Sequence, residues 1–224
     1  SISYYGWGDG MDVFSSSTVI LDGVFCRNSD DCAAVYASTQ GFKGGSNNVL
    51  VKNATLWADV AHPINIGGHG DPNGMDTVQN VTFRNIDILD QAEKQIDYQG
   101  CLAINPGDNT LVRNITFENI RIEDFRNGQL VNFRISFNPK YCVSTGRGIQ
   151  NVLVKDVTYN GSGENLSIIA GYDENHKICG FRFVNLVVNG RKITDDMPGK
   201  PKWYKTGDMA GIFVGEHVEN LSFE

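Results

Sequence analysis

A repeating pattern constrains the fold of this 224-residue chain more than any other feature. In each copy, an asparagine precedes alternating apolar and polar residues and then a second Asn or Asp, as in Asn114-Ile115-Thr116-Phe117-Glu118-Asn119. Self-similarity at such a period is typical of solenoids and related arrays. The clearest copies begin at Asn48, Asn80, Asn114 and Asn151, spaced 32, 34 and 37 residues apart, and looser copies begin at Thr18, Gly180 and Glu219.

The alternation within each copy is the period-2 pattern of strands with one buried face, and no stretch sustains the apolar spacing of an amphipathic helix. The second Asn or Asp tolerates a left-handed backbone and can bond its own main chain, so each copy predicts two short strands joined by a sharp turn. Copies that run in one direction, with connections too short for crossover helices, stack as coils. We therefore predict an all-β fold, a right-handed parallel β-helix.

The composition indicates one domain over residues 1–224, because 41% of the residues are hydrophobic and no Pro/Ser-rich linker divides the chain. A net charge of −7 argues against nucleic acid as a partner, since that binding depends on Lys and Arg. The sequence contains no run of 18 apolar residues of the kind that would indicate a membrane-spanning helix. The oligomeric state cannot be predicted from these features.

The chain shows no signal-peptide pattern at Ser1, although the chemistry inferred below favours a secreted or periplasmic protein. Asp9, a candidate site residue, lies very close to the N-terminus for a solenoid, whose end coils normally need a cap. We therefore expect that upstream coils are missing.

The five cysteines are odd in number and have no CxxC spacing, which argues against a zinc site and leaves a disulfide open. Cys26 and Cys32 flank an acidic motif, and we interpret them as small buried apolar side chains. We predict no metal and no cofactor.

Acidic residues at coil-length spacing are the strongest functional signal. Asp9, in Gly8-Asp9-Gly10-Met11-Asp12, lies 21 residues before Asp30, in Ser29-Asp30-Asp31-Cys32, so Asp9, Asp30 and Asp31 can project into one cleft. Hydrolysis of a glycosidic bond needs one carboxylic acid and one carboxylate. Crowding of the carboxylates should raise at least one pKa and keep that group protonated. Taken alone, Asp30-Asp31 also fits a turn, an Asx cap or a pair of calcium ligands.

Two histidines and two tryptophans are further candidates. His62 lies 31 residues beyond Asp31, about one coil, so it can orient a carboxylate or bond a sugar hydroxyl. His69, in Gly67-Gly68-His69-Gly70-Asp71, competes with it for this role. Trp7 and Trp57 can stack on the faces of a sugar, or they can simply pack between coils.

Three blocks of the sequence together resemble the active-site blocks of glycoside hydrolase family 28, the polygalacturonases. They are Gly8-Asp9-Gly10-Met11-Asp12, Ser29-Asp30-Asp31-Cys32 and His62-Pro63-Ile64-Asn65-Ile66-Gly67. The related dextranase and isopullulanase family 49 shares the fold and the carboxylate trio. The resemblance implies an inverting glycoside hydrolase that cleaves a polysaccharide or oligosaccharide. It also implies that Asp30 is the general acid, that Asp9 and Asp31 form the base pair that activates water, and that His62 supports them.

The chain departs from that family in the Arg-Ile-Lys block that clamps galacturonate carboxylates. Where this block is expected, the chain reads Cys101-Leu102-Ala103-Ile104-Asn105. The chain therefore lacks the main cationic group for bidentate binding of a uronate, unless Lys94 or Arg134 replaces it from a neighbouring coil. We expect polygalacturonate to be a poorer substrate than at least one neutral or branched glycan.

Two other functions fit the same scaffold. A polysaccharide lyase would cleave a uronate by β-elimination and generally needs a strong base and often calcium. A non-catalytic glycan-binding or tailspike-like solenoid would bind without turnover, whether or not the aspartates are present.

Overall fold

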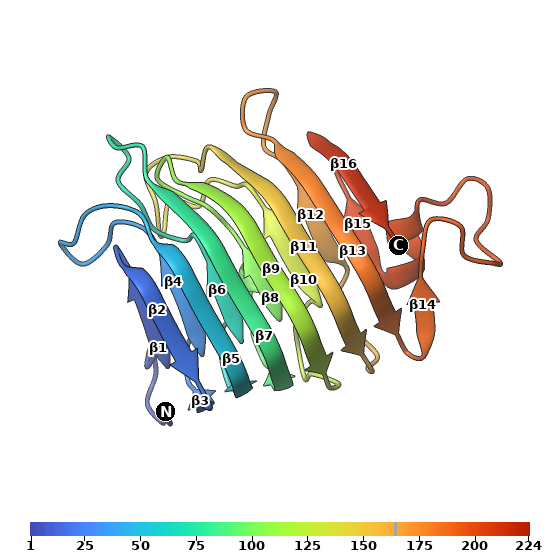
Figure 1. Cartoon of the computed structure of the whole chain (residues 1–224), viewed down its shortest axis with the longest axis horizontal. Coiled ribbons are helices and arrows are strands. Elements are labelled where there is room, and N and C mark those ends of the chain that lie inside the picture. The colour runs from blue at the N-terminus through green and yellow to red at the C-terminus, as the bar shows by residue number, and fades with distance from the viewer. Residues whose placement is uncertain (164) are drawn as a thin grey trace.

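The computed structural model describes residues 1–163 and 165–224, and strands dominate this part of the chain (Figure 1). The helical segments within the described residues are two short 3-10 turns, η1 (Ile96–Tyr98) and η2 (Thr206–Ala210). None of the helices in this described part is long and apolar enough to cross a membrane.

The strands form two sheets that alternate along the chain, so that each coil adds one short strand to the first sheet and a longer one to the second. The short-strand sheet contains, in spatial order, β1 (Met11–Phe14), β4 (Ala33–Tyr36), β6 (Ile64–Ile66), β8 (Leu102–Ile104), β10 (Val131–Arg134), β12 (Ser167–Ala170) and β15 (Ile212–Val214). The long-strand sheet contains β2 (Ser17–Asp22), β5 (Asn47–Ala58), β7 (Thr77–Gln91), β9 (Leu111–Ile122), β11 (Gly148–Tyr159), β13 (Ile178–Val188) and β14 (Arg191–Ile193), with β3 (Phe25–Asn28) on β5 and β16 (Val218–Phe223) on β13.

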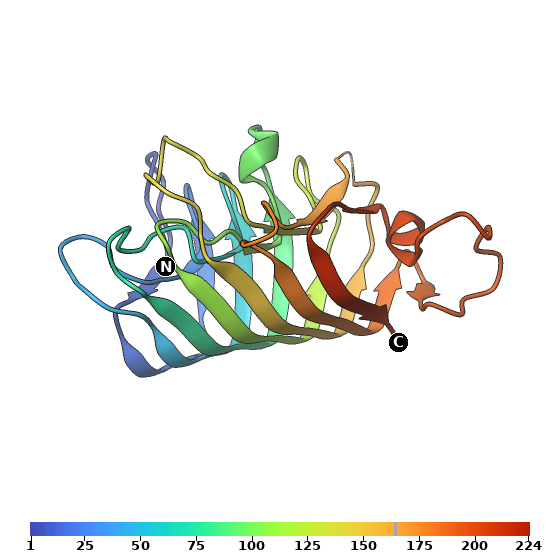
Figure 2. The ribbon, with the colours of Figure 1, turned by 90° about the horizontal axis from the view of Figure 1, so that it is seen from above.

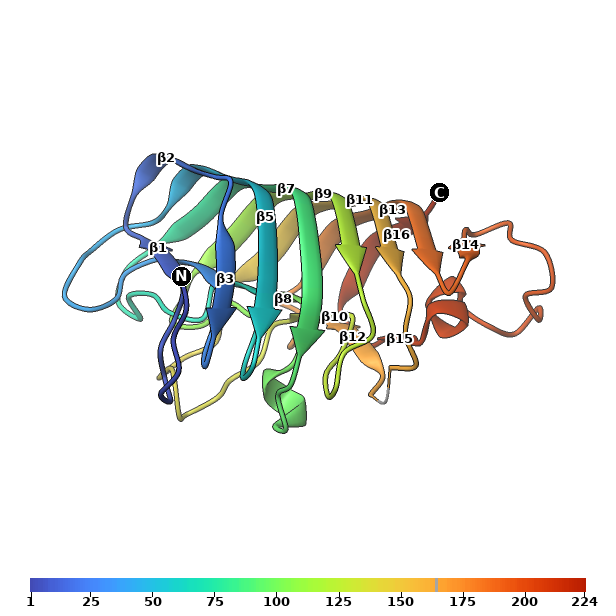
Figure 3. The same ribbon diagram turned by 90° about the horizontal axis from the view of Figure 1, so that it is seen from below.

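The predicted repeats stack in sequence order, which confirms the parallel β-helix. One column of equivalent positions runs through every coil in parallel register, and it comprises Val19, Val49, Val81, Ile115, Val152, Phe181 and Leu221. The coils follow one another along the long axis of the molecule from the N-terminus to the C-terminus (Figures 2 and 3).

The asparagines of the repeat adopt left-handed backbone conformations, as predicted, with φ of 56° at Asn80, Asn85 and Asn114. Their side chains bond across coils, however, and not to their own main chain: Asn85 Nδ2 donates to Asn53 Oδ1 at 2.7 Å, and Asn114 Nδ2 donates to Asn80 Oδ1 at 3.1 Å. The two short strands expected in each copy are observed in the first copy, as β2 and β3, whereas β5, β7, β9, β11 and β13 are each one long strand that continues through these positions. The asparagines thus bend the strand without ending it, and the ladder ties each coil to the next.

Stacked phenylalanines fill the space between the sheets. Phe117 lies nearly parallel to Phe83 at 5.8 Å and to Phe133 at 5.9 Å between ring centroids, and all three are fully buried. Burial of such a side chain contributes about 1.5–3 kcal/mol. This column holds the two sheets in a fixed relation, and so it fixes the strands that carry the site.

The last coils carry an antiparallel hairpin that the repeat did not predict. β13 and β14 pair antiparallel across Asn189 and Gly190, whose φ angles of 50° and 76° fit a type I′ turn. An Asn-Gly pair after an apolar run is the usual signal of such a turn. The stack continues beside it, because β16 pairs in parallel with the first half of β13.

Candidate active site

Register across the short-strand sheet brings the predicted acidic residues together. Met11 pairs with Ala33, and Ala33 with Ile64, so the residues that precede these strands also lie in line. Gly10 N donates to Asp31 O at 2.7 Å, and Cys32 N donates to His62 O at 2.9 Å. Asp9, Asp31 and His62 therefore occupy equivalent positions on three successive coils.

Gly10 allows this close approach between the first two coils. A Cβ at position 10 would lie 2.2 Å from the backbone oxygen of Cys32 and 2.7 Å from the side chain of Asn28. Only glycine fits such a contact, since real Cβ atoms do not approach backbone so closely. The glycine between Asp9 and Asp12 thus lets both carboxyl groups reach the same hollow as Asp30 and Asp31.

Asp31 is buried, with 1% of its surface exposed, and both of its carboxylate oxygens are occupied. Oδ1 contacts the backbone N of His62 at 3.0 Å and its ring Nδ1 at 2.8 Å. Oδ2 accepts hydrogen bonds from Tyr36 OH and Asn65 Nδ2, both at 2.7 Å. Burial acts to raise the pKa of Asp31, but His62 and the hydrogen bonds from His62, Asn65 and Tyr36 outweigh it and hold the pKa below its usual value.

His62 acts on the site through Asp31. Its side chain is fully buried, and its ring lies edge-to-face with Tyr98 at 4.3 Å. Of the two predicted roles, orientation of a carboxylate fits this position, whereas contact with a sugar hydroxyl does not. His69 instead lines the hollow and packs edge-on against Tyr36 at 4.9 Å.

The other carboxyl groups hold their protons more tightly than usual. Partial burial and the charges of Asp31 and Asp9 raise the pKa of Asp30 to about 6. Partial burial and its hydrogen-bonded neighbour Asp9 raise the pKa of Asp12 to about 7. The pKa of Asp9 is also raised, by burial and the charge of Asp31. The cluster therefore holds an ionised Asp31 beside carboxyl groups that can carry a proton near neutral pH.

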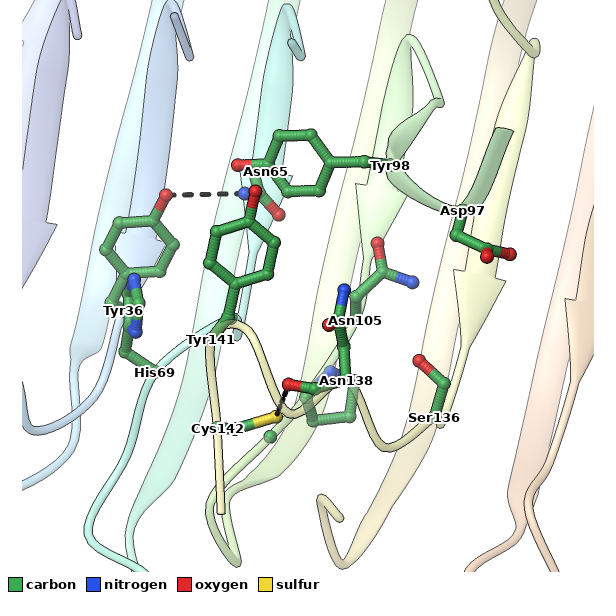
Figure 4. Close-up of a pocket in the computed structure, with 13 residues that line it drawn as sticks. Tyr36, Asn65, His69, Asp97, Tyr98, Asn105, Ser136, Asn138, Tyr141 and Cys142 are labelled. Atoms are coloured by element: carbon green, nitrogen blue, oxygen red, sulfur yellow. Dashed lines mark hydrogen bonds between the residues drawn. The ribbon is translucent and has the colours of Figure 1, made fainter. Parts of the chain in front are cut away.

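Aromatic side chains line the cleft together with the carboxylates. Tyr98, from η1, stacks on Tyr141 with ring centroids 5.2 Å apart. Tyr36, Tyr98 and Tyr141 gather around Asn65 (Figure 4). Such rings offer an apolar face and a hydroxyl to a sugar. The cleft thus combines carboxyl groups with the flat surfaces that carbohydrate recognition uses.

The predicted substrate-binding residues divide into those at the cleft and those away from it. His69 lines the cleft, whereas Arg134 does not line it and is bonded through Nη1 to Asp97 Oδ1 at 3.0 Å. Trp57 is not brought to the cleft: on β5 its ring packs against the Arg27 guanidinium, 4.1 Å from the ring centroid. Trp7 is 91% exposed on the N-terminal segment, and Lys94 is exposed before η1. Neither of these two lines the hollows of this face.

Sequence reasoning missed several residues that complete the site. Asp12 lies on β1. Its place in the same acidic block as Asp9 was the signal available in the sequence. Asn65 was visible within the histidine block, one residue after Ile64. Tyr36, Tyr98 and Tyr141 lie outside the repeat, and no spacing indicated that they meet.

Within residues 1–163 and 165–224, no group of three or more His, Cys, Asp or Glu side chains is arranged to hold a metal ion. All five cysteines are free thiols. The chemistry that the cleft offers from its own residues is proton donation and proton acceptance by carboxyl groups.

The fold and the site together define the class of protein: a parallel β-helix with a carboxylate-lined cleft. The chain belongs to the glycosyl hydrolases family 28, whose family model matches residues 7–199. It is 29% identical over 176 residues to "Probable endo-xylogalacturonan hydrolase A" of Neosartorya fischeri, which covers 78% of the chain and 39% of that protein. It is 30% identical over 158 residues to "Probable endopolygalacturonase D" of Emericella nidulans, which covers 69% of the chain and 27% of that protein.

The chain thus spans less than two-fifths of the length of these relatives. None of the solved structures gave a significant match to it.

Proposed function

We propose that this chain hydrolyses glycosidic bonds in a pectin-type polysaccharide, by direct displacement with water. The observation that carries the proposal is the convergence of Asp9, Asp30 and Asp31 in one cleft, where Asp30 has a raised pKa and Asp31 a lowered one. The raised pKa keeps Asp30 protonated as an acid, and a second carboxyl group in the same cleft can act on water, which is what this reaction needs. The names of the relatives support galacturonan-type polymers as the substrate.

In this proposal, Asp30 donates its proton to the leaving glycosidic oxygen. Asp9, exposed in the cleft, takes the proton from the attacking water. Asp31 was expected to share the base role, but the four hydrogen bonds to its oxygens favour a different contribution. It stays ionised and keeps the proton on Asp30 through its negative charge.

A polymeric substrate also favours action outside the cell, since a long glycan does not cross a membrane intact. This supports the secreted or periplasmic location expected from the sequence. Inversion at the anomeric carbon remains the implication of the family resemblance, and the anomer of the first product, observed by NMR, tests it.

The Asp30→Asn variant tests the proposal, with Asp196→Asn, at an exposed aspartate of the C-terminal loop, as its matched control. Loss of a general acid lowers the rate by roughly 10² to 10⁴. We expect that loss in reducing ends released from galacturonan for Asp30→Asn, a smaller loss on substrates whose leaving group needs no protonation, and normal activity for Asp196→Asn. Near-normal turnover by Asp30→Asn would contradict the proposal. Absorbance from an unsaturated uronate product would show a lyase instead.

A further inference from the structure

A second hollow adjoins the carboxylate cleft and shares Tyr36, His69, Tyr98 and Tyr141 with it. Its remaining lining comes from the coils that follow, on β6, after β8 and in the segment beyond β10 (Figure 4). A glycan bound across Asp30 therefore extends into this hollow as it crosses the coils. What lines the hollow decides which sugar fits beside the bond that is cut.

The polar side chains that this hollow does not share with the cleft are three amides, the Ser136 hydroxyl, the Asp97 carboxylate and the Cys142 thiol. Asn65 is 97% buried, and its Nδ2 donates to Asp31. Its Oδ1 is buried and has no hydrogen-bond partner among the described residues. A buried acceptor without a donor is rare, so this oxygen calls for a donor such as a sugar hydroxyl.

Asn105 follows β8 on the next coil and also lines the hollow. Its Nδ2 donates to Asn132 Oδ1 at 3.0 Å and to the backbone oxygen of Arg134 at 3.2 Å, which leaves Oδ1 as an acceptor. Ser136 and Asn138 face it across the hollow (Figure 4). Acceptors on one side with hydroxyl and amide groups on the other match the hydroxyls of a sugar, each of which donates and accepts.

The charges around the hollow disfavour a uronate. No Lys or Arg is among the described residues that line it. Asp97 is the one carboxylate among them, and it is bonded to Arg134. The nearby Lys140 lies over the ring of Tyr141, 4.8 Å from its centroid. A sugar carboxylate placed here would be desolvated with no cation among the described lining residues to pair with, which is costly.

We infer that this hollow is a subsite for an uncharged sugar unit, and this inference rests on the proposed function. The unit is either a neutral branch sugar or a backbone galacturonate whose charge is masked by a methyl ester. Asn65 and Asn105 accept hydrogen bonds from its hydroxyls, and Tyr98 and Tyr141 cover its apolar face.

Binding to the Asp30→Asn variant tests the inference without turnover. Three galacturonate oligomers of equal backbone length serve as probes: unesterified, fully methyl-esterified and xylose-branched. We expect at least one uncharged form to bind about tenfold more tightly than the unesterified oligomer, since only the unesterified oligomer would place a desolvated carboxylate in the hollow. A gain for the branched oligomer alone identifies a branch subsite, and a gain for the ester identifies a backbone subsite.

Adding Asn105→Lys to this background supplies the missing cation and should reverse the preference toward the unesterified oligomer. Ser136→Ala should weaken binding of the uncharged probes about fivefold, because one hydrogen bond is lost. Ser222→Ala, on β16 in the long-strand sheet, should leave all three dissociation constants unchanged. Tightest binding of the unesterified oligomer before any change at position 105 would overturn the inference. The inference would also be overturned if Asn105→Lys and Ser136→Ala each changed the dissociation constants of all three probes by the same factor. Failure of the Asp30→Asn activity test would instead affect only the proposed hydrolysis.

Discussion

Asp31 and His62 are 31 residues apart in the sequence, and their Oδ1 and Nδ1 atoms lie 2.8 Å apart with both side chains buried. The two residues occupy equivalent positions on adjacent coils. The stacking of the coils therefore helps to determine whether Asp31, in the cleft, stays ionised. A carboxylate in this position keeps its charge only while its hydrogen-bond donors remain.

His62→Leu should therefore destabilise the fold strongly. Removing the side-chain partner of a buried charge costs about 3–5 kcal/mol, because the charge of Asp31 is left without that compensation. Arg182→Ala breaks the exposed pair with Glu224, also 2.8 Å long, and should cost about 1 kcal/mol or less. Chemical denaturation of both variants measures the difference. Equal losses would show that burial does not strengthen the dependence on His62.

The pH dependence of turnover should follow Asp30. Since a general acid must be protonated, and the pKa of Asp30 is raised to about 6, kcat/KM should fall as the pH rises through about 6. Replacement of neighbouring Asp31 by Asn removes the charge that helps to raise this pKa, so the fall should move to lower pH in any residual activity. A pH–rate profile of both proteins gives the two values. An unchanged midpoint in Asp31→Asn would contradict the coupling.

Asp12→Asn should stabilise the protein at pH 8 and have little effect at pH 4. The folded-state pKa of Asp12, about 7, lies above its ordinary value of 3.8. Its stabilising contribution is therefore present below about pH 4 and is lost as the pH rises through 7. Because Asp12 is exposed and water screens it, the gain at pH 8 should be about 1 kcal/mol. Thermal melts at the two pH values measure it, and an equal shift at both would disprove the titration argument.

The sequence predicted those features that depend on the repeat. The distance of 31 residues between Asp31 and His62 was correctly read as one coil, whereas Asp9 proved to lie level with Asp31 and not with Asp30. The strand register determines which residues lie level with one another on adjacent coils. Spacing in the sequence alone cannot tell which of two adjacent aspartates in a turn lies level with Asp9. The alternation of apolar residues likewise predicted the buried column.

Residues outside the repeat could not be placed in this way. Tyr98 and Tyr141 come from connections of different length, so only the folded chain shows that their rings stack. Trp57 looked suited to a sugar by its type, but it lies on the long-strand sheet beside Arg27. Arg134 looked suited to a clamp by its charge, but Asp97 holds its guanidinium. Side-chain type identifies what a residue can bind, whereas its partners decide what it does bind.

The asparagine ladder offers a prediction that separates backbone strain from hydrogen bonding. Asn85 has a φ of 56°, donates to Asn53 at 2.7 Å and accepts from Asn119 at 3.3 Å. Asn85→Gly keeps the left-handed backbone and loses the two bonds, at a cost of about 1–3 kcal/mol. Asn85→Ala should cost about 1–2 kcal/mol more, because its Cβ disfavours that conformation. Urea denaturation measures both, with exposed Asn73→Ala as a control expected within about 0.5 kcal/mol of the parent. Equal stability of the Gly and Ala variants would mean that the left-handed turn is not a source of strain at this position.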